Sequence, residues 1–148
     1  MQKKNTKLII GRLEKIDFPE FSISNLDAKI DTGAYTSSLH CHHIEPIKSN
    51  GENWVQFILL DPHHPEYEEN PFSAPIYKIR KVKSSNGQIQ ERFTIKRKVI
   101  FFGKIRTIEL TLTDRSEMKF PVLVGRKFLA DKFLVDVSKK YLTHQDQS

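Results

Sequence analysis

Alternation of apolar and polar residues over short stretches dominates this chain of 148 residues. Successive side chains of a β-strand point to opposite faces, so a period of two predicts a strand. The pattern recurs at 7–16, 26–30, 54–60, 75–82, 88–102, 106–113, 120–124 and 133–137. Only residues 126–132 have a helical pattern, about two turns long. The sequence therefore predicts an all-β barrel or sandwich with one short helix near the C-terminus.

Turn signals separate these stretches. Asn86-Gly87 predicts a hairpin with a type I′ turn, because both residue types tolerate positive φ angles. Gly103 predicts a second hairpin between Phe102 and Ile105. Residues 61–75 contain several prolines and a local acidic cluster, so they are expected to form an irregular surface loop. No repeat or linker is evident, which predicts one domain over 1–148 with an ordered core at about 8–142.

The composition is that of a globular protein, with 38% hydrophobic and 28% charged residues. No apolar run approaches the roughly 20 residues that span a bilayer. The basic N-terminal stretch precedes only residues 8–10, whereas a signal peptide needs an apolar segment of about 7–15 residues. The single cysteine, Cys41, excludes an internal disulfide and fits a reducing compartment. We expect a cytoplasmic protein with no membrane partner.

Positive charge is concentrated in one part of the chain, whose formal net charge is +6. Residues 78–106 hold ten basic residues and one acid, Glu91. The segment is either the solvated face of exposed strands or a docking surface for an acidic partner. The aromatic residues Phe93, Phe101 and Phe102 follow the strand alternation, which favours a core role over base stacking. No nucleic-acid partner is expected.

The triplet Asp31-Thr32-Gly33 directly follows the predicted strand 26–30. Such a triplet alone often marks only a turn. It can also supply half of a carboxylate dyad, because two aspartates held close together share one proton. The ionised carboxylate then activates water while the protonated one polarises a peptide carbonyl. The chain contains one such triplet, so a dyad requires a second copy of the chain.

Three longer motifs accompany the triplet: Ala28 to His40, Val82 to Gly87 and Leu110 to Arg126. Together they resemble the family described as ATP-dependent zinc proteases, a domain of unknown function associated with RimK-type glutamate ligases. This family is similar in turn to the retropepsins, the single-domain aspartic proteases typified by retroviral enzymes. The resemblance covers roughly residues 8–142.

The resemblance implies a closed acid-protease barrel that works as a homodimer on a peptide or protein substrate, in connection with a RimK-type ligase system. It implies catalytic Asp31 from two subunits in a retropepsin-type endopeptidase. The implied active-site loop is Thr32, Gly33 and Ala34, and the flap is Ser84, Ser85, Asn86 and Gly87. The implied supporting residues are His40, Gly125 and Arg126.

One position departs from the retroviral pattern. Retroviral proteases usually carry an aspartate two residues after the glycine, where it pairs with the helix arginine. Here that position is Tyr35. Arg126 therefore needs another partner, either a backbone carbonyl or a carboxylate such as Asp114 or Asp136.

Histidines are the candidate metal ligands. In a strand, His40 and His42 would share one face, while Cys41 and His43 would share the other. The segment lacks the usual zinc spacings, so no cofactor is expected, with His40 and His42 as weak zinc candidates. The other interpretations are an exposed polar segment, or His40 as a substrate contact. His63 and its neighbours are expected at the surface.

Two alternatives to an aspartic peptidase stay open at this point. One is a non-catalytic module that binds peptide tails on the same fold, linked to RimK-type glutamate ligation. The other is a zinc-dependent hydrolase that uses the histidines.

Overall fold

The computed structural model describes residues 6–60, 64–83, 85–114 and 119–144. It confirms an all-β chain with one short helix, α1 (Arg126–Leu129). The strands are β1 (Leu8–Ile10), β2 (Leu13–Phe18), β3 (Ile23–Ile30), β4 (Ser37–Ser49), β5 (Glu52–Leu59), β6 (Phe72–Pro75), β7 (Lys78–Lys83), β8 (Ile89–Phe101), β9 (Lys104–Thr113), β10 (Val122–Val124) and β11 (Phe133–Val135). Short 3-10 helices lie at Pro19–Phe21 and Leu142–His144.

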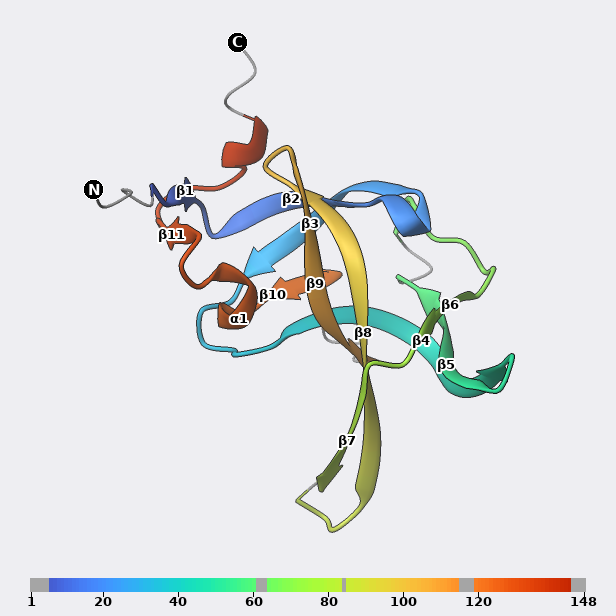
Figure 1. The fold of residues 1–148 in the computed structure, drawn as a ribbon. Coiled ribbons are helices and arrows are strands. Elements are labelled where there is room, and N and C mark those ends of the chain that lie inside the picture. The colour runs from blue at the N-terminus through green and yellow to red at the C-terminus, as the bar shows by residue number, and fades with distance from the viewer. Residues whose placement is uncertain (1–5, 61–63, 84, 115–118, 145–148) are drawn as a thin grey trace, which may run out of the picture.

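Six strands form a closed barrel in the order β10, β3, β2, β8, β9 and β4 (Figure 1). The short strand β10 closes it, because Val122 pairs with Ala28 of β3 in parallel and with Leu39 of β4 in antiparallel fashion. β5 and β6 extend the sheet beyond β4, and β7 pairs only with β8. The closed barrel is the architecture that the family resemblance implied.

Alternating burial explains why these segments are strands. In β2, Glu14, Ile16 and Phe18 are buried, and the residues between them are partly exposed. The interior is continuous and includes fully buried Phe57 and Phe101. Burial of each apolar side chain of this size stabilises the folded state by roughly 1.5–3 kcal/mol.

Both predicted hairpins are present, but the turn of one of them differs from expectation. At the β8–β9 hairpin Phe101 pairs with Lys104, and Phe102 and Gly103 both have positive φ angles of 52° and 74°. This is the two-residue type I′ geometry. At the β7–β8 hairpin, the type I′ prediction is wrong, because the longer loop 84–88 connects the last paired residues and Gly87 takes up the positive φ. This hairpin extends away from the barrel (Figure 1).

Three segments differ from the sequence prediction. Residues 7–16 form two strands rather than one, since Gly11 lies against the C-terminal segment and β1 pairs with β11 instead. β6 lies inside the predicted loop 61–75, where Ala74 pairs with Val55. α1 is shorter than predicted and ends at Leu129.

The strand β4 was not predicted as an element at all. Its inner residues Leu39, His40 and Cys41 are buried in succession, so they break the period of two. A register irregularity between His42 and Glu45 in its pairing with β5 interrupts the pattern again.

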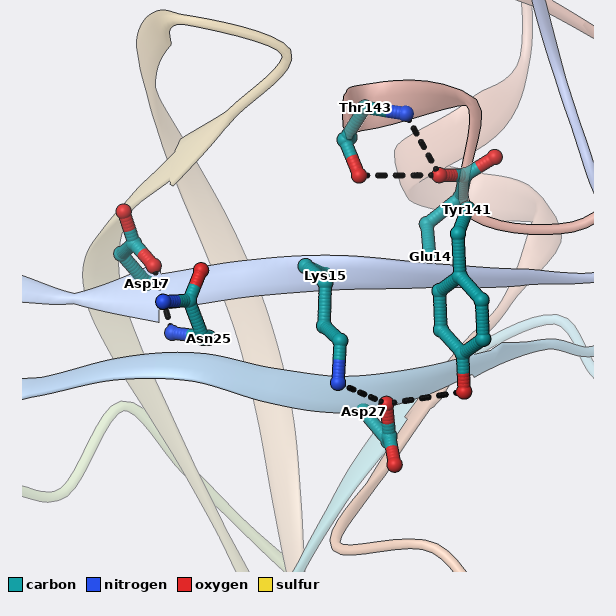
Figure 2. Close-up of polar contacts among 7 residues, drawn as sticks. All are labelled: Glu14, Lys15, Asp17, Asn25, Asp27, Tyr141 and Thr143. Atoms are coloured by element: carbon teal, nitrogen blue, oxygen red, sulfur yellow. Dashed lines mark hydrogen bonds and ion pairs between the residues drawn. The ribbon is translucent and has the colours of Figure 1, made fainter. Parts of the chain in front are cut away.

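The C-terminal segment lies against β2 and β3 (Figure 2). Glu14 of β2 accepts hydrogen bonds from the main-chain N–H and the hydroxyl of Thr143, at 3.0 and 3.1 Å. On β3, Asp27 Oδ1 accepts from Lys15 Nζ at 2.6 Å and from the Tyr141 hydroxyl at 3.1 Å. In the described residues, no helix is both long and apolar enough to cross a membrane.

Candidate active site

Asp31 lies in the loop that leads from β3 to β4. Its main-chain N–H donates to Val124 O of β10 at 2.8 Å, which fixes the start of the loop to the barrel. Gly33 N donates to Asp31 Oδ1 at 3.1 Å. Asp31 and Ala34 are partly exposed and Thr32 and Gly33 are exposed. The carboxylate is therefore held by a main-chain donor in a loop that solvent and ligands can reach.

The N-terminal end of α1 holds the rest of this loop. Arg126 N donates to Ala34 O at 2.8 Å, and Lys127 N donates to Tyr35 O at 2.9 Å. These amides would otherwise lack partners, because the first N–H groups of a helix have no acceptor within it.

Gly125 allows this close approach. A Cβ atom at this position would lie 2.4 Å from Thr36 O, so a side chain cannot be accommodated unless the backbone moves. Gly125 N donates to the hydroxyl of Ser37 at 3.0 Å, and Ser37 is buried. The role of Ser37 is not predictable from the sequence, because one serine in a polar run carries no signal of its partner.

Arg126 has the backbone partner that was one of the predicted options. Its Nη1 donates to Thr32 O at 2.9 Å, and its guanidinium lies 5.9 Å from the centre of the Tyr35 ring. The two carboxylates considered as alternatives have other partners: Asp114 contacts His42, and Asp136 accepts from Ser138. Arg126 thus braces the loop from its outer side.

The described residues of the implied flap lie at the tip of the β7–β8 hairpin. Ser85, Asn86 and Gly87 are exposed, and Asn86 Oδ1 accepts from Gln88 N at 3.3 Å. Ser84 lies outside the described residues.

A cavity of about 410 Å³ separates this hairpin from α1. Its residues come from the loop after Asp31, from β7, β8 and β9, and from the region of α1. They are Tyr35, Thr36, Ser37, Lys78, Arg80, Thr94, Lys96, Thr107, Ile108, Glu109, Thr111, Lys127, Phe128 and Lys132. A second cavity of about 250 Å³ shares Thr36, Arg80 and Thr111 with it and adds Arg92. The surface between the hairpin and the loop is therefore concave and basic.

One ion pair lies in the lining of the larger cavity. Lys127 Nζ lies 2.7 Å from Glu109 Oε2. This hydrogen bond lowers the pKa of Glu109 below its ordinary value of 4.5, and the charges of Lys78 and Lys96 lower it further. Lys96 Nζ also lies 3.9 Å from the centre of the Tyr77 ring.

The histidine segment is partly interior. His40 and Cys41 are buried, so the expectation of an exposed polar segment is wrong for both. His40 and His42 share a face as predicted, with ring centres 4.8 Å apart, and His42 Nδ1 lies 3.1 Å from Asp114 Oδ1. Burial and the charge of Asp114 raise the pKa of the Cys41 thiol, which keeps it protonated.

The weak zinc candidates His40 and His42 have no suitable set of further donors in the part of the chain that the structure describes. Within those residues, no group of three histidine, cysteine, aspartate or glutamate side chains could hold a metal ion. His63 lies outside the described residues. His40 and His42 therefore do not fit a zinc site with the described donors.

Curated proteins similar to this chain match it over most of its length but are themselves much longer. A protein of Shewanella halifaxensis (strain HAW-EB4) named probable alpha-L-glutamate ligase is 36% identical over 145 residues, which is 95% of this chain and 31% of that protein. A protein of the same name from Parasynechococcus marenigrum (strain WH8102) is 30% identical over 134 residues, 88% of this chain and 28% of that protein. The chain spans about a third of the length of the curated relatives it matches.

The fold has a solved counterpart. The crystal structure of a Legionella pneumophila protein of unknown function (DUF785) superimposes with a TM-score of 0.76 at 27% identity. The match covers 93% of this chain and 99% of that one. The model of the RimB-like family, described as retropepsin-like aspartic endopeptidase RimB, matches residues 9–146. The family resemblance seen in the motifs is thereby confirmed, and the chain belongs to the RimB-like family of retropepsin-like proteins.

Proposed function

We propose that this protein is an aspartic endopeptidase that acts in the cytoplasm and is completed by a second copy of the chain. The observation that carries the proposal is the loop of Asp31. Its carboxylate is accessible, accepts a bond from Gly33 N, and stands on a loop that α1 and Arg126 fix in place. Membership of the RimB-like family supports the same assignment.

The mechanism uses one Asp31 from each subunit. Two carboxylates across a twofold axis share a proton, because both cannot be ionised at short range. The ionised one takes a proton from water while the water oxygen bonds to the peptide carbonyl carbon. The protonated one donates its proton to the carbonyl oxygen. When the tetrahedral intermediate collapses, the C–N bond breaks and the amine nitrogen takes the proton from the carboxyl group that accepted it from water. One hydroxyl of the intermediate returns its proton to the other carboxylate, which restores the shared proton.

Substitution of Asp31 tests the catalytic part of this proposal. Asp31→Asn keeps the shape of the side chain and its acceptor oxygen, but it cannot supply an ionised carboxylate. We expect hydrolysis of a quenched fluorescent peptide to be lost while the circular dichroism spectrum and melting temperature stay those of the wild type. Cleavage by Asp31→Asn at the wild-type rate would reject the mechanism.

A second candidate function, binding of acidic peptide tails, has its own support. The larger cavity is lined by five cationic side chains and one carboxylate, and it includes Tyr35, Thr36 and Ser37, which directly follow the active-site loop in the chain. The curated relatives are named probable alpha-L-glutamate ligases and are about three times longer than the matched region. A glutamate-rich tail is the acidic peptide that a RimK-type ligase system would present to such a surface.

One assay separates cutting from binding. A labelled oligoglutamate peptide is incubated with wild-type protein and with Asp31→Asn, and both anisotropy and product formation are followed. Binding by both proteins with cleavage only by the wild type supports the peptidase. Binding by both with no product at acid or neutral pH supports the tail-binding module instead.

A further inference from the structure

The carboxylate inside the basic cavity has a specific position. Glu109 stands on β9 directly opposite Lys96 of β8, and its side chain is 20% exposed. Thr107 and Thr111 lie two residues to either side, so all three face the cavity from one strand. Among the described residues that line the cavity, every charged side chain except Glu109 is a cation.

Glu109 neutralises Lys127, the lining cation that belongs to α1. Its partner Lys127 reaches across from α1, and the Nζ–Oε2 distance is 2.7 Å. Lys127 also donates its main-chain N–H to Tyr35 O, four residues after Asp31. The side chain that meets Glu109 therefore belongs to a residue that anchors the loop.

We propose that Glu109 is a specificity-determining residue, an internal counterion that a ligand carboxylate replaces on Lys127. The proposal rests on the proposed function, in that an acidic peptide occupies the basic cavity. While Glu109 is paired with Lys127, a ligand carboxylate can contact Lys127 only by displacing the Glu109 carboxylate. The exchange keeps one ion pair at Lys127 and adds none. Glu109 therefore weakens the binding of acidic ligands selectively and leaves the binding of neutral ligands almost unaffected.

The mechanism makes a sharp prediction for Glu109→Gln. Glutamine keeps the size of the side chain and removes its charge, which frees Lys127 for the ligand. An ion pair at a partly exposed site contributes about 0.2–1 kcal/mol, which corresponds to a gain of roughly 1.4- to fivefold in affinity. The gain should be seen for an acidic peptide only.

The experiment measures binding in the Asp31→Asn background, so that cleavage cannot interfere. Anisotropy gives Kd for a labelled oligoglutamate peptide and for a length-matched peptide in which glutamine replaces glutamate. Glu109→Gln should tighten only the first. Glu52→Gln, an exposed acid at the far end of the β4–β5 hairpin, is the matched control and should change neither. Lys127→Gln should weaken the binding of the acidic peptide. Adding Glu109→Gln to the Lys127→Gln variant should not restore that binding.

Several outcomes would overturn the proposal. These are an unchanged Kd in Glu109→Gln, an equal change for both peptides, and the same change in Glu52→Gln. Failure of the oligoglutamate peptide to bind any variant also rejects it. None of these results touches the catalytic role of Asp31, which the cleavage assay with Asp31→Asn tests separately.

Discussion

At the scale of single residues, Gly125 controls how closely α1 approaches the active-site loop. Its missing side chain leaves room for Thr36 O, and its N–H is bound by the buried hydroxyl of Ser37. The sequence motif marked Gly125 and Arg126 as important. It could not reveal that Arg126 would bind Thr32 O, because a backbone acceptor leaves no trace in the residue types.

Gly125→Ala should separate the loop from α1. The added methyl group would meet backbone atoms, and overpacking of this kind destabilises by about 1–3 kcal/mol. Since the loop carries Asp31, we expect lost hydrolysis together with a lower melting temperature. Gly51→Ala is the control: its φ is +79°, but a Cβ there meets nothing within 4 Å. It should lower stability slightly and leave hydrolysis intact, and wild-type hydrolysis by Gly125→Ala would contradict the role of this contact.

At the scale of elements, the C-terminal segment is fastened to β2 and β3 through polar side chains (Figure 2). Buried Glu14 accepts four hydrogen bonds: from Gly11 N at 2.7 Å, from Leu142 N at 3.1 Å, and from the amide and hydroxyl of Thr143. A carboxylate suits this position because it offers acceptors only. The alternation of residues predicts the strand that carries Glu14, but it gives no sign of the hydrogen-bond partners of Glu14 in the C-terminal segment.

Glu14→Gln should loosen this attachment. The amide group would place N–H donors against N–H donors, and loss of bonds to a charged acceptor costs about 2–4 kcal/mol in total. Urea unfolding measures the change. Asp17→Asn on the same strand is the matched control, since partly exposed Asp17 accepts one hydrogen bond among the described residues, from Asn25 N, and it should cost well under half as much. Equal costs for the two variants would show that Glu14 has no special role.

The same attachment should also respond to alkaline pH. Burial, and then the hydrogen bond to Asp27, raise the pKa of Tyr141 above its ordinary value of 10.0. A pKa raised by folding means that the stabilisation is complete below pH 10 and is lost as pH rises through the folded pKa. The free energy of unfolding should therefore fall above pH 10 in the wild type and less steeply in Tyr141→Phe. Parallel curves for the two proteins would contradict this.

The extent to which the sequence predicts the structure differs between elements. Segments with one buried face, such as β2 and β9, are predictable, because alternation records their burial directly. β4 is not, since its residues 39–41 are all buried where the strand passes between β9, β10 and β5. β6 is hidden among prolines, and its pairing with β5 depends on residues distant from it along the chain. The position of Asp31 follows from its motif, whereas the cavity depends on how β7, β9 and α1 come together.

At the scale of the whole molecule, the proposed activity depends on a partner copy. One chain provides one Asp31, one loop and one hairpin. A carboxylate dyad needs two Asp31 side chains, so a second chain must provide the other. The central claim is therefore that neither subunit cuts alone. Wild-type protein and Asp31→Asn can be mixed at constant total concentration, allowed to exchange subunits, and assayed with a fluorescent peptide.

The dependence of activity on the wild-type fraction is the most direct measurement. If each active site needs Asp31 from both subunits, activity follows the square of that fraction, and an equal mixture retains about a quarter of the wild-type rate. If each chain works by itself, activity falls linearly and the equal mixture retains about half. The account predicts the quadratic curve, and a linear one would contradict it.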